Sequence, residues 1–142
     1  MSAPPFGTQL IGQTEKTLNA ILARLLAGTG LTEPQWVVLT VAVMGGAAES
    51  DQFAARVADA LKLNDSDARA IVTSLVTNGF LEVTNGLVKA TSMGEELQTR
   101  VRTSVGQITE RLWGDFPAED LATAGRVLAG VLNRANAELA NA

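Results

Sequence analysis

Apolar residues recur at intervals of three and four between positions 10 and 26, which predicts an amphipathic helix with one narrow buried face. The glycines at positions 28 and 30 end this pattern. A second helix is predicted to begin at Thr32, because Gln35 completes a capping box and Pro34 is tolerated in a first turn. This helix is apolar on nearly every side, so we expect it to be central, buried and terminated by Gly45-Gly46.

The middle of the chain predicts two short helices joined by a tight turn at residues 62–64. The first begins at Ser50 or Asp51, and the second is capped by Asn64. Gly79 occupies the position of a glycine that ends a helix. The buried face of the second helix is expected to contain Ala68, Ile71, Val72, Leu75 and Val76.

The apolar period then changes from 3.6 to 2, which predicts a β-hairpin. Residues 80–84 and 87–90 form the two strands, and Asn85-Gly86 between them is the preferred pair for a two-residue type I′ turn. A helix followed by a turn, a second helix and such a hairpin is typical of a winged helix-turn-helix.

Two long amphipathic helices follow the hairpin. Ser92 and Glu95 match a capping box for the first of them, and Pro117 begins the second after a break at Gly114. We therefore predict a mainly α fold with a small β-hairpin wing, in one domain spanning residues 1–142. Within it, residues 32–91 form the winged helix-turn-helix, and residues 8–29 and 92–142 form helices that we expect to dimerise.

Composition narrows the possible functions. The 142 residues include no cysteine, histidine or tyrosine, which excludes disulfides and any enzyme that needs a histidine base or a cysteine nucleophile. We assign no catalytic residue, metal ligand or cofactor. The N-terminus lacks a basic, apolar signal segment and no stretch suits a membrane span, so we expect a cytoplasmic protein. The net charge of −4 is unlike the basic surplus of most nucleic-acid binders.

Four segments of the chain resemble the MarR family of bacterial transcription regulators. Residues 30–39 resemble that family's entry into its second helix, and residues 53–63 resemble its first helix-turn-helix element. Residues 71–81, which read IVTSLVTNGFL, resemble the end of its recognition helix and the start of its wing. Residues 90–94 resemble the exit from the wing into the long helix. The resemblance covers nearly the whole chain, and the order and spacing of the segments carry it.

The resemblance implies an obligate homodimer, held by the first, fifth and sixth predicted helices, that acts as a repressor or other regulator on a pseudo-palindromic operator. It implies a recognition helix in the major groove of double-stranded DNA and a small aromatic or phenolic ligand that weakens operator binding. The family's wing usually carries an Asp-x-Arg-Arg type element. Here residues 84–87 form a shortened wing, with only Lys89 as a nearby cation.

The outward face of the helix that follows Asn64 is the candidate DNA-contacting surface. Arg69 suits bidentate pairing with guanine, and hydroxyl groups beside it suit base edges or phosphates. The alternative is an ordinary solvated helix face. Between residues 53 and 90, four cations accompany four carboxylates, so we expect modest phosphate neutralisation. The predicted DNA-binding residues are Ser66, Arg69, Ala70, Thr73, Lys62, Asn85 and Lys89.

Two residues are candidates for ligand binding. Trp36 lies on the predicted buried helix, where a core role is the favoured alternative, and Arg24 could bind a carboxylate or simply be solvated. For Trp113 the pattern leaves open a dimer interface or a cleft. The acidic balance and the shortened wing also leave a second function open, namely a winged-helix protein-interaction module that has lost strong DNA binding.

Overall fold

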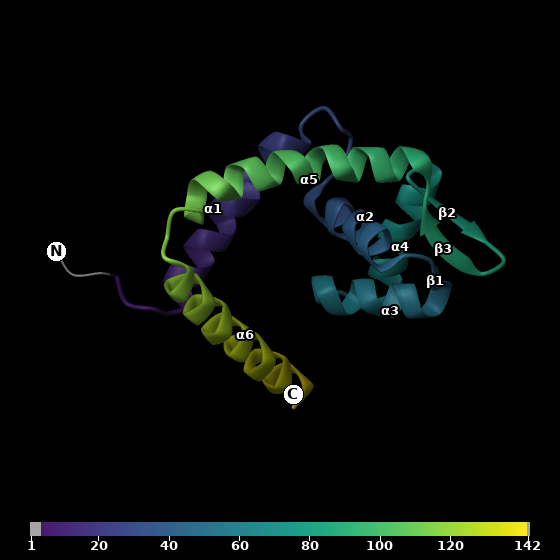
Figure 1. The fold of residues 1–142 in the computed structure, drawn as a ribbon. Helices are drawn as coiled ribbons and strands as arrows, with labels where there is room; N and C mark the ends of the chain where they lie inside the picture. The colour runs from purple at the N-terminus through teal and green to yellow at the C-terminus, as the bar shows by residue number, and fades with distance from the viewer. Residues whose placement is uncertain (1–3, 142) are drawn as a thin grey trace. The chain divides into compact units, whose positions relative to one another are not determined.

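The computed structural model describes residues 4–141 and divides the chain into two compact units, one through Val105 and one from Gly106. The predicted mainly α fold with a small hairpin is confirmed (Figure 1). In chain order the elements are α1 (Thr8–Leu26), α2 (Glu33–Gly45), β1 (Ala48–Glu49), α3 (Ser50–Leu61), α4 (Asp65–Thr77), β2 (Leu81–Thr84), β3 (Leu87–Ala90), α5 (Ser92–Trp113) and α6 (Ala118–Ala140).

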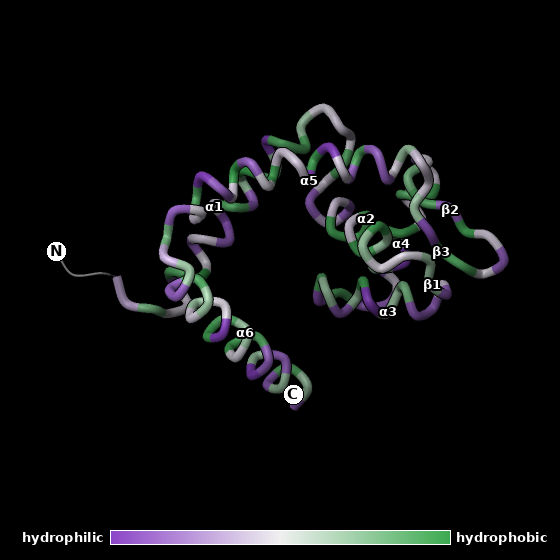
Figure 2. Tube along the Cα trace, in the orientation of Figure 1, coloured by the Kyte–Doolittle hydropathy of each residue, from purple (hydrophilic) through white to green (hydrophobic). Residues whose placement is uncertain are grey.

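The core of the first unit surrounds α2, which is largely hydrophobic along its length (Figure 2). Val38 and Leu39 of this helix are completely buried. Phe53 of α3, Leu75 of α4 and Leu81 of β2 belong to the same apolar cluster. The prediction of a central, buried second helix is therefore confirmed.

The start of α2 is fixed by the predicted capping box. The Oγ1 atom of Thr32 accepts from the backbone N–H of Gln35 at 3.3 Å, and Oε1 of Gln35 accepts from the N–H of Thr32 at 2.9 Å. The same Gln35 donates from Nε2 to Oγ of Ser74 in α4 at 3.1 Å. The Gln35 side chain therefore helps to cap the start of α2 and also links this helix to α4.

The predicted helix-turn-helix is present between residues 50 and 77. Helix α3 begins at Ser50, but its cap is Glu49, whose carboxylate accepts from the N–H groups of Asp51 and Gln52 at 3.0 Å. Asn64 caps α4 as predicted, because its Oδ1 accepts from the N–H of Asp67 at 2.7 Å. These caps set where both helices begin.

The hairpin is also confirmed, with Asn85 and Gly86 both at positive φ, as a type I′ turn requires. A third strand, β1, was not predicted; it pairs antiparallel with β3 and gives the order β1-β3-β2. Beside it, the N–H and the hydroxyl of Ser50 both donate to the Gly86 carbonyl, at 2.9 and 3.0 Å. The wing turn is thus attached to the first turn of α3.

The predicted cap of α5 was wrong by one residue, because Thr91, not Ser92, performs this role. The hydroxyl of Thr91 accepts from the N–H of Gly94 at 3.1 Å and donates to the carbonyl of Gly79 at 2.6 Å. Its N–H donates to the carbonyl of Phe80. Thr91 therefore connects the end of α4, the base of the hairpin and the start of α5.

Gln98 of α5 is a polar residue in this core. It is 0% exposed, and neither Oε1 nor Nε2 has a hydrogen-bond partner among the described residues. An unpaired buried polar group costs about 1–3 kcal/mol. We therefore expect Gln98→Met, which keeps the unbranched shape, to raise the free energy of unfolding by about 1 kcal/mol in urea denaturation. A decrease would contradict the placement of this amide.

The second unit contains the last part of α5 and α6. Of the residues of α6, all of which are described, none is buried. Hydrophobic and hydrophilic positions alternate along this helix (Figure 2). Among residues 4–141, no helix combines the length and the apolar character that crossing a membrane requires.

Candidate nucleic-acid interface

The outward face of α4 is presented as the sequence pattern predicted. Ala68 and Leu75 are buried against the core, which fixes the rotation of the helix. The four residues of α4 that are predicted to meet DNA are all exposed; they are Ser66, Arg69, Ala70 and Thr73. The face is therefore accessible, while its contact with DNA stays a prediction.

Arg69 is not a solitary cation on this face. Its Nε donates to Oδ2 of Asp65, one turn earlier on α4, at 2.7 Å. Its Nη2 donates to Oδ1 of Asp51, in the first turn of α3, at 2.8 Å. The hydrogen bonds that the guanidinium donates to Asp65, and then those to Asp51, raise its pKa above its already high ordinary value. Arg69 keeps its charge, and 45% of its side chain remains exposed.

Lys62 lies in the turn between α3 and α4 and adopts a left-handed backbone conformation, with φ of 56°. Its ammonium group forms an ion pair with Oδ1 of Asp59 at 3.2 Å. Both side chains are well exposed, so this pair contributes little to stability.

Of the two wing residues predicted to contact DNA, Asn85 lies at the exposed tip and Lys89 is ion-paired within the hairpin. Asn85 is exposed in the turn, and the hairpin tip is hydrophilic (Figure 2). Lys89 lies on β3 directly opposite Glu82 of β2, and the register brings Nζ within 3.3 Å of Oε1 of Glu82. Three of the predicted cations, at positions 62, 69 and 89, are thus paired with carboxylates of the same chain.

The winged helix-turn-helix as a whole is acidic. Between residues 32 and 91 there are seven carboxylates and four cations, a net charge of −3. The acidic residues are Glu33, Glu49, Asp51, Asp59, Asp65, Asp67 and Glu82. The basic residues are Arg56, Lys62, Arg69 and Lys89. Phosphate attraction from this surface is therefore weak, and specificity would depend on a few positioned donors.

The sequence pattern did not predict that Asp51 forms an ion pair with Arg69. Asp51 was predicted only as a possible start of a helix, but its carboxylate accepts a hydrogen bond from Arg69, which is 18 residues later in the chain. The Asp65–Arg69 spacing of four residues was a usable signal, because such pairs face each other on a helix. The Asp51 contact has no local signal, since it depends on how α3 packs against α4.

The two candidate ligand residues lie on different helices of the first unit. Trp36 is half-buried and packs against the core cluster, as the alternative reading of this residue expected. Arg24 is exposed in the last turn of α1, where a cation suits the helix dipole. Ligand binding by either residue stays a prediction.

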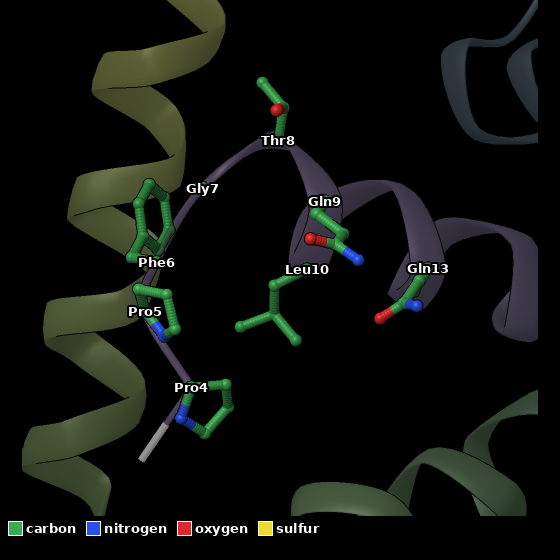
Figure 3. Close-up of a pocket in the computed structure, with 8 residues that line it drawn as sticks. All are labelled: Pro4, Pro5, Phe6, Gly7, Thr8, Gln9, Leu10 and Gln13. Atoms are coloured by element: carbon green, nitrogen blue, oxygen red, sulfur yellow. The ribbon is translucent and has the colours of Figure 1, made fainter. Parts of the chain in front are cut away.

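Each of the two units has a surface hollow. One, of about 400 Å³, is formed by residues 4–10 and Gln13, none of which is charged. Figure 3 shows Leu10 and the ring of Pro4 facing this space, whereas Thr8 points away. The other, of about 580 Å³, lies in the second unit and is lined by Trp113, Phe116, Leu121 and Leu128 among others. Trp113 thus lines a hollow within its own unit.

Comparison with known proteins identifies the fold. No protein-family model and no curated protein matches the sequence. Solved structures do match: ligand-free NadR has a TM-score of 0.76 at 18% identity, over 92% of this chain and 98% of that chain. A mutant MarR from E. coli has a TM-score of 0.69 at 21% identity, over 93% and 99% of the two chains.

CouR from Rhodococcus jostii, bound to p-coumaroyl-CoA, gives a TM-score of 0.72 at 21% identity, over 86% of this chain and 88% of that chain. The agreement extends over nearly the full length of each protein. The resemblance inferred from four sequence segments is therefore confirmed at the level of the fold. The chain has the winged-helix fold of the MarR-family transcription regulators.

Proposed function

We propose that this chain is a DNA-binding transcription regulator whose α4 enters the major groove of a duplex. The observation that carries the proposal is the exposed face of α4, presented beside a hairpin that Ser50 attaches to α3. A helix that is held in this way by its buried side, and that is the second helix of a helix-turn-helix, suits insertion into a groove. Arg69, Ser66 and Thr73 would supply the donors to base edges and phosphates.

The regulator would act as a homodimer. Every residue of α6 has solvent contact, and its exposed leucines form one continuous stripe. A second copy of the chain would cover this stripe and place two α4 helices on successive major grooves, about 34 Å apart on a pseudo-palindromic site. A small aromatic or phenolic ligand is the proposed effector class, because NadR has been solved with 4-hydroxyphenylacetate and CouR with p-coumaroyl-CoA, and both of these molecules contain a phenol ring.

A second function is favoured by the charge of the surface. Residues 32–91 carry a net charge of −3, and Lys62, Arg69 and Lys89 are all ion-paired. Such a surface could instead contact a basic protein partner, as a winged-helix interaction module would. The two functions differ in whether the protein binds duplex DNA selectively.

Selection from a random-sequence duplex pool at low salt distinguishes them. We expect the protein to enrich one pseudo-palindromic sequence and to bind it with a salt slope near −5, if the dimer neutralises about six phosphates. Fluorescence anisotropy at several salt concentrations measures the slope. Failure to enrich any sequence, together with no retention on heparin at low salt, would contradict the DNA-binding function and favour the interaction module.

A further inference from the structure

We propose that Asp51 and Asp65 are specificity-determining residues, which hold Arg69 in the orientation that reads one guanine in each half-site. This inference rests on the proposed DNA-binding function and assigns a role to two carboxylates that oppose DNA by their charge. They come from different helices, 18 and 4 residues before Arg69, so the guanidinium is held from two directions.

The donors that remain on Arg69 fit a guanine. A guanidinium has five N–H donors, and here Nε is used by Asp65 and one Nη2 hydrogen by Asp51. The two hydrogens of Nη1 and one of Nη2 have no partner among the described residues. Guanine is the base that presents two adjacent acceptors, O6 and N7, in the major groove. Two neighbouring Nη donors therefore match its edge.

The same carboxylates disfavour a phosphate as the partner of Arg69. One guanidinium between two carboxylates has a net charge of −1, so an anionic phosphate oxygen is repelled while a neutral base edge is not. Arginine also loses much rotamer freedom when it binds, and two existing ion pairs reduce the freedom left to lose. The arrangement thus lowers affinity for DNA in general and raises selectivity for one base.

Asp67 provides a matched control for the charge effect. It lies in the first turn of α4, as Asp65 does, and it is exposed. Its side chain accepts from Nδ2 of Asn64, and the hydrogen bonds and ion pairs of Arg69 go to Asp65 and Asp51 instead. Asp67→Asn therefore removes the same charge from the same helix turn without changing what holds the guanidinium.

The experiment uses the full-length protein and the duplex that wild type enriches from a random pool. Affinity is measured for this duplex and for versions in which each guanine is replaced by 7-deazaguanine, which lacks the N7 acceptor. We expect wild type to discriminate at one guanine per half-site by about 10-fold or more, and Arg69→Ala to lose that discrimination. Asp51→Asn and Asp65→Asn should each reduce the discrimination several-fold while binding the substituted duplex more tightly.

Asp67→Asn should also bind more tightly but should keep the wild-type discrimination. Circular dichroism checks that each variant is folded, and Asp51→Asn keeps the test valid if Asp65→Asn weakens α4. Equal changes in discrimination for all three aspartate variants, or unchanged discrimination in Arg69→Ala, would overturn the inference and leave the proposed function standing. If wild type enriches no sequence, the inference is overturned, and if wild type is also not retained on heparin at low salt, the proposed function is overturned with it.

Discussion

A protein carrying Leu128→Glu and Leu132→Glu should be monomeric and should bind its DNA site about 100-fold more weakly, or worse. Leu128 and Leu132 are 47% and 57% exposed and lie on the same face of α6 as Leu121 and Leu139. In the proposed dimer this stripe is buried. Each glutamate would then place a charge in an apolar contact, and the two-fold symmetry would repeat both substitutions.

The loss of DNA affinity follows from the loss of the second recognition helix. When two half-sites are bound by one dimer, the second contact forms at a high effective concentration, typically worth a factor of 10²–10⁴. A monomer has only one α4 and no such gain. Sedimentation velocity would report the oligomeric state, and anisotropy with the enriched duplex would report the affinity.

Thr123→Glu with Ala137→Glu is the matched control for the dimer experiment. These exposed residues lie on the opposite side of α6 from the leucine stripe, and the variant gains the same negative charge. It should remain dimeric and lose only the affinity expected from added charge. A dimeric Leu128→Glu/Leu132→Glu protein, or a wild type that is itself monomeric at micromolar concentration, would contradict the α6 interface.

Gly94→Ala should destabilise the fold by about 3 kcal/mol, a large part of the stability of an ordinary domain. A Cβ atom at this position would overlap the carbonyl oxygen of Phe80 and lie 3.2 Å from Cδ1 of Leu39. The Phe80 carbonyl cannot move away easily, because it accepts the hydrogen bond from Thr91 that closes the wing. The start of α5 would have to separate from the hairpin base.

Gly106→Ala is the control for the Gly94 substitution. It lies later in α5, where a Cβ atom would meet nothing within 4 Å. Alanine there should leave stability unchanged or raise it by about 0.5–1 kcal/mol through its better helix propensity. Urea denaturation of both variants measures the difference. Equal stability of the Gly94 and Gly106 variants would contradict the close packing of α5 on the Phe80 carbonyl.

Local chemistry explains why much of the fold could be predicted. The Thr32–Gln35 box, the Asn64 cap and the Asn85-Gly86 turn each use atoms at most three residues apart. The features that were not predicted either have too few residues to show a pattern or have two candidate residues next to each other. Strand β1 has two residues, too few to show a period. At the start of α5 the sequence favours Ser92 as the cap, because Glu95 completes a capping box with Ser92, whereas the third residue after Thr91 is Gly94.

The amino-acid sequence by itself determined the order of the helices, the hairpin and the outward face of α4, because periodicity and turn chemistry act between near neighbours. Only the tertiary structure decided that Arg69 also contacts a carboxylate of another helix. Its partner Asp51 is 18 residues away, and the packing of α3 against α4 brings the two charges to 2.8 Å. Coulomb attraction depends on distance through space and not along the chain.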